Sequence, residues 1–170
     1  MKNMVNEPDA TRNPISTVKD YPNGVTNLNI QRITSREIDI PSILKSIDDG
    51  GVGAKVLFLG AVRNFSDNGD VEGMTYESYV GMAEEKIKNI ETDAKRTWGV
   101  KKISIVHRIG DLRVGENSVA IAVSNSHSKD AFAACQFILD KIKREVPIWK
   151  KEKIKHGETK WVEGKPMKQQ

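Results

Sequence analysis

Three short segments of the chain carry cationic or imidazole side chains next to turns, where they could hold an anion. The first is Gly60–Asn64, in which Arg63 follows an apolar run. The planar guanidinium of an arginine can donate two parallel hydrogen bonds to a phosphate or a carboxylate. Because Arg63 leaves an expected strand for a loop, it is a candidate anion ligand. A solvated arginine at a strand end is the simpler interpretation when this segment is considered alone.

The second segment, Ser124–Asp130, is expected to join a buried strand to the start of a helix. The first N–H groups of a helix are unpaired and the helix dipole adds positive potential there, so such a junction can bind an anion. His127 is placed to donate a hydrogen bond to that anion. The alternative is a plain helix N-cap at Ser126 or Ser128, with no ligand role for His127.

The third segment combines Lys143 with Val146–Glu152, and it could supply an acid or a base. Lys143 follows Leu139 by one helical turn, and Pro147 then turns the chain so that Lys150 can return toward Lys143. Two nearby ammonium groups repel each other, and partial burial lowers a lysine pKa, which would allow proton exchange near neutral pH. The alternative is a solvated basic helix end.

Other common chemical patterns are missing from the sequence. There is one cysteine, Cys135, so no intramolecular disulfide can form, and no Cys/His cluster has the spacing of zinc ligands. Cys135 falls on the apolar side of an expected helix, which favours packing over a nucleophilic role. No Walker loop, GxGxxG or HExxH motif occurs. The tryptophans are interpreted as core or interface anchors: Trp98, Trp149 and Trp161.

The composition indicates one globular domain. The 170 residues are 38% hydrophobic and 29% charged, which is enough apolar material for a core without a structural metal. No stretch approaches the roughly 20 apolar residues of a membrane span, and the N-terminus has no secretory apolar region, so we expect a cytoplasmic protein. The net charge of +4 is concentrated around Lys141–Lys155. This favours an anionic small ligand or an acidic protein partner over nucleic acid.

Hydrophobic periodicity predicts the elements that must position these segments. Residues 1–27 are expected to be a disordered or loosely attached extension, residues 28–165 the domain and residues 166–170 a tail. Asp39 is expected to cap a short helix. Apolar residues recur at helical spacing in two longer segments, Met82–Trp98 and Ser128–Glu145.

Short apolar or alternating runs predict the strands. Their order relative to the helices is typical of an α+β fold, in which two main helices cover a mostly antiparallel sheet. The expected strands are Leu28–Ile33, Gly53–Val62, Val71–Ser78, Lys102–His107, Asn117–Ser124 and Thr159–Val162.

Taken in chain order, these segments resemble the large-subunit family of molybdopterin synthase. The resemblance covers roughly residues 28–165 and implies an α/β hammerhead fold with an added small antiparallel subdomain. The matching stretches are FLGAVRN (Phe58–Asn64), TWGV (Thr97–Val100), IVHRIGDLRVGE (Ile105–Glu116), SNSHSKDAF (Ser124–Phe132), IKREVPIWKKE (Ile142–Glu152) and WVEG (Trp161–Gly164).

The resemblance also implies an assembly and a reaction. The large subunit would form a homodimer, within a heterotetramer that adds two copies of a small ubiquitin-like sulfur carrier. The carrier ends in Gly-Gly with a C-terminal thiocarboxylate, and its tail would enter the large subunit's pocket. Two sulfur transfers would convert cyclic pyranopterin monophosphate, called precursor Z, to molybdopterin in molybdenum cofactor biosynthesis. The resemblance implies no metal or organic cofactor for this step.

Carried over residue by residue, the resemblance assigns roles to specific positions. Lys143 and Lys150 would be catalytic, while Arg63 and His127 would hold the cyclic phosphate. Phe58 and Leu139 would wall the pocket. The implied substrate-binding set is Ala61, Val62, Arg63, His127, Ser128, Lys143, Lys150, Lys151 and Glu152.

One position departs from the family pattern. The family usually has arginine after the histidine, and Ser128 stands there instead, which removes one guanidinium from the anion site. Lys129 could substitute for it, as could Lys165 of the other subunit. With that change, we expect Arg63, His127, Lys143 and Lys150 to converge on one positively charged hollow.

Two interpretations from other classes remain open. A non-enzymatic adaptor would use the same lysines to bind an acidic protein tail. A small RNA-binding domain would need exposed aromatic side chains clustered on its sheet, and the sequence shows no suitable cluster.

Overall fold

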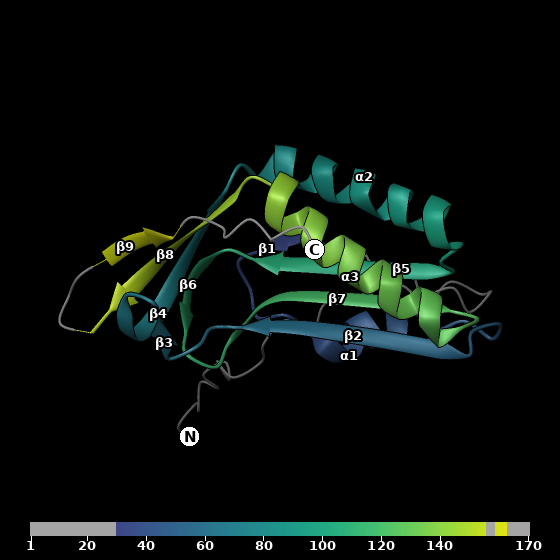
Figure 1. Ribbon diagram of the computed structural model, residues 1–170, viewed down its shortest axis with the longest axis horizontal. Helices are drawn as coiled ribbons and strands as arrows, with labels where there is room; N and C mark the ends of the chain where they lie inside the picture. The colour runs from purple at the N-terminus through teal and green to yellow at the C-terminus, as the bar shows by residue number, and fades with distance from the viewer. Residues whose placement is uncertain (1–29, 156–158, 163–170) are drawn as a thin grey trace, which may run out of the picture.

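The computed structural model describes residues 30–155 and 159–162 of the chain, which form two β-sheets and three helices (Figure 1). The first sheet has the strand order β1-β5-β7-β2, and the second has the order β3-β4-β8-β9 with β6 paired to β4. The expected extension at 1–27, the tail at 166–170 and Lys165 lie outside the described residues. The strands are β1 (Ile33–Thr34), β2 (Ala54–Ala61), β3 (Phe65–Ser66), β4 (Gly69–Ser78), β5 (Lys102–Arg108), β6 (Gly110–Arg113), β7 (Asn117–Asn125), β8 (Ile148–Ile154) and β9 (Thr159–Val162).

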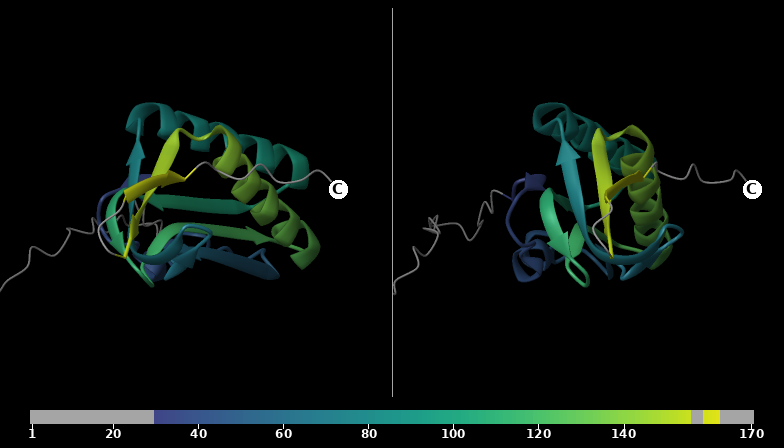
Figure 2. Two further views of the ribbon diagram at one scale, coloured as in Figure 1. Left: turned by 60° about the vertical axis from the view of Figure 1, so that its left-hand side comes forward. Right: turned by 90° about the vertical axis from the view of Figure 1, so that its left-hand side faces the viewer.

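The first sheet is covered on both faces. Helices α2 (Val80–Trp98) and α3 (Ser128–Glu145) lie on one face, and the short helix α1 (Ile40–Ser46) lies on the other (Figures 1 and 2). Ile121 of β7 points into the core beneath α2 and α3, whereas its neighbour Ala122 points into the core beneath α1. All pairings except β1 with β5 are antiparallel. The predicted α+β class with a small added antiparallel sheet is confirmed.

The helices form where the apolar stripes were expected, and their ends have local causes. In α2 the stripe includes Ala83, Ile87 and Ile90, all buried. Gly99 follows with a φ of 60°, and its N–H donates to the Lys95 carbonyl, which closes the helix. None of the helices in the described ranges is long and apolar enough to cross a bilayer.

The second sheet differs most from the expectation. The segment Ile148–Ile154 was expected only to turn the chain back, but it is a full strand, β8, between β4 and β9. Its pairing with β4 sets Lys150 opposite Tyr76 and Glu152 opposite Met74. A buried cluster of Val62, Met74 and Leu112 joins this small sheet to the end of β2.

A buried histidine lies where the two sheets meet. His107 at the end of β5 is only 6% exposed, and its ring contacts the Tyr76 ring edge-on at 5.3 Å between centroids. Its Nδ1 lies 2.9 Å from the carbonyl oxygen of Arg108, to which it donates when protonated there. Burial lowers the pKa of His107 from 6.5 to about 4. The imidazole is therefore neutral in the folded protein at physiological pH.

His107 should make the fold sensitive to acid. Between pH 6.5 and about 4 the unfolded chain binds more protons than the folded chain, so stability falls as the pH falls. The loss from this group is at most about 3 kcal/mol. We expect His107→Phe, which keeps an aromatic ring against Tyr76, to flatten the decline in unfolding free energy between pH 7 and pH 4.5 in urea titrations. An unchanged pH dependence in this variant would show that other groups cause the acid sensitivity.

Candidate active site

Arg63 extends from the end of β2 on a firmly held backbone. The neighbouring Val62 is 3% exposed; its N–H donates to the Glu116 carbonyl at 3.0 Å, and its carbonyl accepts from the Gly115 N–H at 2.8 Å. The Arg63 side chain itself is exposed, and its guanidinium carbon lies 4.9 Å from the centre of the Phe65 ring. A cation–π contact of this kind restrains the guanidinium while leaving its donors available.

Lys150 reaches the same place from β8, because strand alternation points it and Glu152 to one face of the small sheet. Together with the end of β2 they line a small hollow of about 80 Å³. The charges on its walls are two cations, Arg63 and Lys150, against one carboxylate, so a positive balance favours an anionic ligand. The lining residues are Ala61, Val62, Arg63, Phe65, Val71, Met74, Tyr76, Lys150 and Glu152.

Glu152 connects two of the segments that line the hollow through buried hydrogen bonds. Its side chain is buried, at 5% residue exposure, and its Oε2 accepts hydrogen bonds from Ser66 Oγ at 2.8 Å and Asn68 Nδ2 at 2.9 Å. These two donors belong to the β3–β4 hairpin, which follows Arg63 in the chain. The carboxylate therefore links the strand that carries Lys150 to the hairpin beside Arg63.

The floor of the hollow is aromatic and uncharged. Tyr76 is half-buried, and burial raises its phenol pKa, an effect that a hydrogen bond with Ser118 partly opposes. His107 packs against it in neutral form. A low-polarity floor strengthens the interaction of Arg63 and Lys150 with a bound anion.

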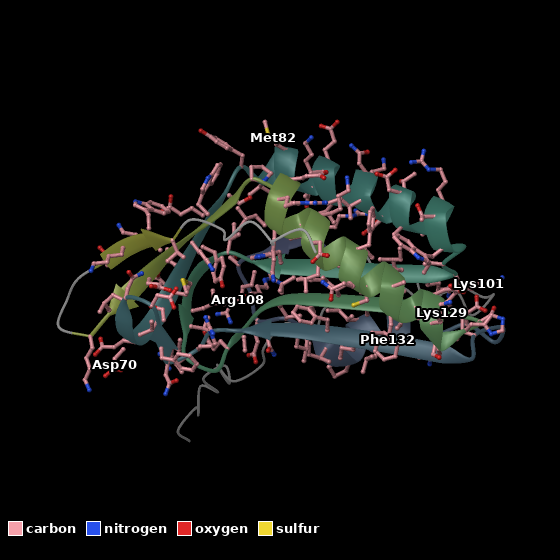
Figure 3. All side chains as sticks on the ribbon, in the orientation of Figure 1. Asp70, Met82, Lys101, Arg108, Lys129 and Phe132 are labelled. Carbon is pink, nitrogen blue, oxygen red and sulfur yellow. The ribbon has the colours of Figure 1, made fainter. Side chains whose placement is uncertain are left out.

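The His127 segment lies at the opposite end of the chain's first sheet. Ala54 pairs with Asn125 and Ala61 with Asn117, so His127 follows β7 beside the start of β2, whereas Arg63 follows the end of β2. Seven residue steps of a strand span about 23 Å. Lys129, which belongs to this segment, and Asp70, in the small sheet, lie at opposite ends of the molecule in Figure 3. The expected convergence of His127 with Arg63 is therefore wrong within one chain.

The first turn of α3 has no side-chain cap, so its N–H groups are not occupied by a capping side chain, as an anion site there requires. His127 is itself the N-cap, and no side chain forms a capping hydrogen bond there, so the alternative of a serine cap at Ser126 or Ser128 is wrong. His127, Ser128 and Lys129 are all exposed. The first turn of α3 is therefore uncapped by a side chain and accessible to solvent.

The remaining predicted residues lie outside the hollow. Lys143 is exposed in the last turn of α3, so the partial burial expected of it is not found. Lys151 points to the opposite face of β8 from Lys150, with its Nζ 5.3 Å from the centre of the Trp161 ring. Phe58 and Leu139 are half-buried and pack against the main core.

The expectation for the single cysteine is confirmed. Cys135 is buried on α3, and burial raises its thiol pKa to about 11, which agrees with a packing role.

The tryptophans differ in their exposure. Trp98 packs on Phe137 in the core, but Trp149 is exposed and contacts the exposed Tyr79 at 5.6 Å between ring centroids. The small sheet therefore does carry surface aromatics. Within the described ranges, no three His, Cys, Asp or Glu side chains gather as a metal site.

A larger hollow of about 530 Å³ lies beside β4 and β6. Most of the charged side chains that line it form ion pairs with one another. Lys153 pairs with Asp111 at 2.9 Å, and Arg108 lies 3.5 Å from Glu116. Its three cations face three carboxylates, which gives no net preference for an anion. Its lining residues are Glu72, Gly73, Arg108, Asp111, Leu112, Arg113, Glu116 and Lys153.

Comparison with known proteins gives a consistent result over most of the chain. Residues 33–145 match the family model described as MoaE protein. A protein of Pseudomonas aeruginosa named molybdopterin synthase catalytic subunit is 42% identical over 115 residues, covering 68% of this chain and 76% of the relative. A solved structure of molybdopterin synthase from Staphylococcus aureus superposes with a TM-score of 0.74 at 37% identity, covering 77% of this chain and 95% of that one.

A further solved structure shares the fold at lower identity. It is a complex of subunits 1 and 2 of molybdopterin-converting factor from Helicobacter pylori. The TM-score is 0.63 at 24% identity, over 80% of this chain and 90% of that one.

The buried carboxylate of Glu152 should be a stability determinant as well as a part of the site. Glu152→Ala leaves the Ser66 hydroxyl and the Asn68 amide without their acceptor, which should cost about 1–3 kcal/mol in urea unfolding. Glu152→Gln retains an acceptor oxygen and should lose less. Equal stability of the alanine variant and the native chain would contradict this role.

Proposed function

The chain belongs to the MoaE protein family, and on that premise we propose that it acts as the catalytic subunit of a molybdopterin synthase. The observation that supports this best is the meeting of Arg63 and Lys150, from distant strands, in one basic hollow. The proposed reaction converts cyclic pyranopterin monophosphate to molybdopterin. The sulfur comes from the C-terminal thiocarboxylate of a small ubiquitin-like carrier.

Each group at the hollow has a proposed task. Arg63 anchors the cyclic phosphate, because a guanidinium donates two parallel hydrogen bonds to an oxyanion. Lys150 donates to the carbonyl oxygen of the thiocarboxylate and assists proton transfer while sulfur replaces an oxygen on the substrate carbon. Water then cleaves the acyl–sulfur bond, which leaves the sulfur on the substrate and releases the carrier as a carboxylate. Glu152 positions Lys150 through its bonds to the hairpin. Two rounds, each with a fresh carrier, supply the two sulfur atoms of molybdopterin.

The carrier's tail is a suitable partner for this hollow. A glycine-terminated tail is slender and ends in a negative charge, which matches two cations around a space of about 80 Å³. The Helicobacter pylori complex of two converting-factor subunits is a precedent for such a pairing on this fold. The lone buried Cys135 suits a reducing compartment such as the cytoplasm.

His127 and Ser128 can join this site only from a second copy of the chain. They lie beyond the start of β2, about 23 Å or more from Arg63 in the same copy. A homodimer that sets the start of one β2 beside the end of the other would add the open N-terminus of α3 to the phosphate site. We therefore propose a site shared between two copies, with Lys129 or Lys165 compensating for Ser128.

A lysine pair on one strand provides a sharp test of Lys150. Lys150→Ala should lower kcat for molybdopterin formation about 100-fold, measured with precursor and thiocarboxylated carrier, because a cation at the reacting carbonyl is lost. Lys153→Ala is the matched control, since Lys153 lies on the other face of β8 in an ion pair with Asp111. Equal losses in the two variants would assign Lys150 a structural role.

Lys143 can be tested separately, because it is exposed and lies outside the hollow in a single copy. We expect Lys143→Ala to lower kcat about 100-fold as well, in line with the loss of a general acid or base. Near-normal turnover in this variant would rule out a catalytic role for Lys143. An adaptor would form no molybdopterin with any variant, including the native chain.

A further inference from the structure

The hollow between Arg63 and Lys150 is small for the groups that the proposed function brings to it. Its volume of about 80 Å³ corresponds to two or three water molecules. The proposed reaction places a phosphate at Arg63 and the end of a peptide tail at Lys150 at the same time. Because these two groups together need more room, at least one wall of the hollow has to move.

Most walls of the hollow belong to firmly held parts of the fold. Val62 and Met74 are buried in the cluster that joins the small sheet to β2. Tyr76 lies in β4 with a pairing partner on each side, in β6 and in β8. Lys150 lies in β8, which is paired with both β4 and β9. Moving any of these residues would break backbone pairing or buried contacts.

The remaining wall is the tip of the β3–β4 hairpin, Phe65–Gly69, which is held by fewer contacts (Figure 1). Strand β3 has two residues and pairs with β4 at two positions. Phe65 is 57% exposed and belongs to none of the buried clusters of the described residues. Local opening costs least where few apolar contacts are buried, so this tip is the wall that can move.

The base of the hairpin is fixed and can act as a hinge. The Val71 N–H donates to the Asn64 carbonyl at 2.9 Å, and the Lys155 N–H donates to the Asp70 carbonyl at the same distance. Gly69 joins the tip to this base with a φ of 117°. Glycine adopts a wider range of backbone angles than any other residue, so the tip can turn while the base stays paired.

Two polar side chains hold the tip against β8. Ser66 Oγ and Asn68 Nδ2 donate to the same oxygen of Glu152, at 2.8 Å and 2.9 Å. Ser66 Oγ also accepts from the Asn68 N–H at 3.1 Å, which keeps the two donors together. Hydrogen bonds to a carboxylate are stronger than those between neutral groups, so these bonds favour the closed position. They can break and form again without disturbing a buried apolar contact.

We propose that Ser66 and Asn68 are positioning residues that hold the hairpin tip closed against Glu152, and that the tip swings out to admit ligands to the hollow. The identity of the ligands rests on the proposed function, whereas the motion follows from the contacts of the hairpin. When the tip is closed, the Phe65 ring lies 4.9 Å from the guanidinium carbon of Arg63 and completes the hollow. When it is open, the hollow lacks one wall and a ligand can enter.

The first experiment measures the opening of the tip in the full chain without any ligand. Val71 lines the hollow and is 5% exposed, so a thiol introduced by Val71→Cys should react with dithionitrobenzoate only when the tip opens. Adding Ser66→Ala should raise that reaction rate about tenfold to a hundredfold, because a hydrogen bond to a charged group is lost. Cys135, buried on α3, reports global unfolding in the same molecule and should react much more slowly in both variants.

Two variants control this measurement. Ser66→Thr keeps the hydroxyl and should leave the rate at the level of Val71→Cys alone. Thr75→Ala removes another hydroxyl that donates to a carboxylate, Asp111, but it acts between β4 and β6 and should not change the rate. The proposal is wrong if the thiol at position 71 reacts as slowly as Cys135, or if Ser66→Ala and Thr75→Ala have equal effects.

The second experiment tests whether opening controls access to the hollow. Binding of cyclic pyranopterin monophosphate to the full chain is followed by stopped-flow tryptophan fluorescence, since Trp149 precedes Lys150 in β8. Ser66→Ala should bind about tenfold faster than the native chain, because more molecules are open when the ligand arrives. A purely structural contact would not give faster binding when it is removed, so an unchanged or lower association rate would overturn the gating role.

The two proposals fail in different ways. A native chain that shows the thiol reaction but forms no molybdopterin with thiocarboxylated carrier would reject the proposed function and support the moving tip. Normal molybdopterin formation by a chain whose thiol at position 71 reacts no faster than Cys135 would support the function and reject the moving tip.

Discussion

The pairing of β2 with β7 is the constraint on which the candidate site depends. In this antiparallel ladder Ala54 lies opposite Asn125 and Ala61 opposite Asn117. The segments that follow the two strands therefore leave the sheet at opposite ends. No choice of side-chain rotamer can bring Arg63 to His127 within one copy. A site that uses both residues, as proposed above, therefore needs a second copy of the chain.

The small sheet carries the second constraint, which is the position of Lys150. Strand β8 is held on both edges, by β4 and by β9, so the backbone of Lys150 has little freedom. Glu152 adds a buried carboxylate, whose burial would be costly without hydrogen bonds. Ser66 and Asn68 supply those bonds from the hairpin after Arg63. One carboxylate thus couples the two segments that bring the cations of the hollow.

The sequence was informative wherever burial leaves a regular pattern of apolar residues. The helices α2 and α3 were predicted closely because each buries one stripe, and β2 and β7 because each is a short apolar run, which in β7 is buried on both faces. Strand β8 was missed because Lys150–Lys153 places charged residues on both faces, which erases a period of two. Tyr76 and Met74 were missed as site residues, since their proximity to Lys150 and Glu152 depends on long-range strand pairing. No local signal encodes that pairing.

The hollow of a single copy is small for a pterin. About 80 Å³ is room for two or three waters, whereas pockets for small molecules usually measure about 300–1,000 Å³. One copy can therefore seat a phosphate or the end of a peptide tail, but it cannot enclose a pterin. An open corner would suit the proposed sulfur donor, a protein tail, because each product would need two donors in succession. If partners close the proposed site, the donors can be exchanged without unfolding any strand.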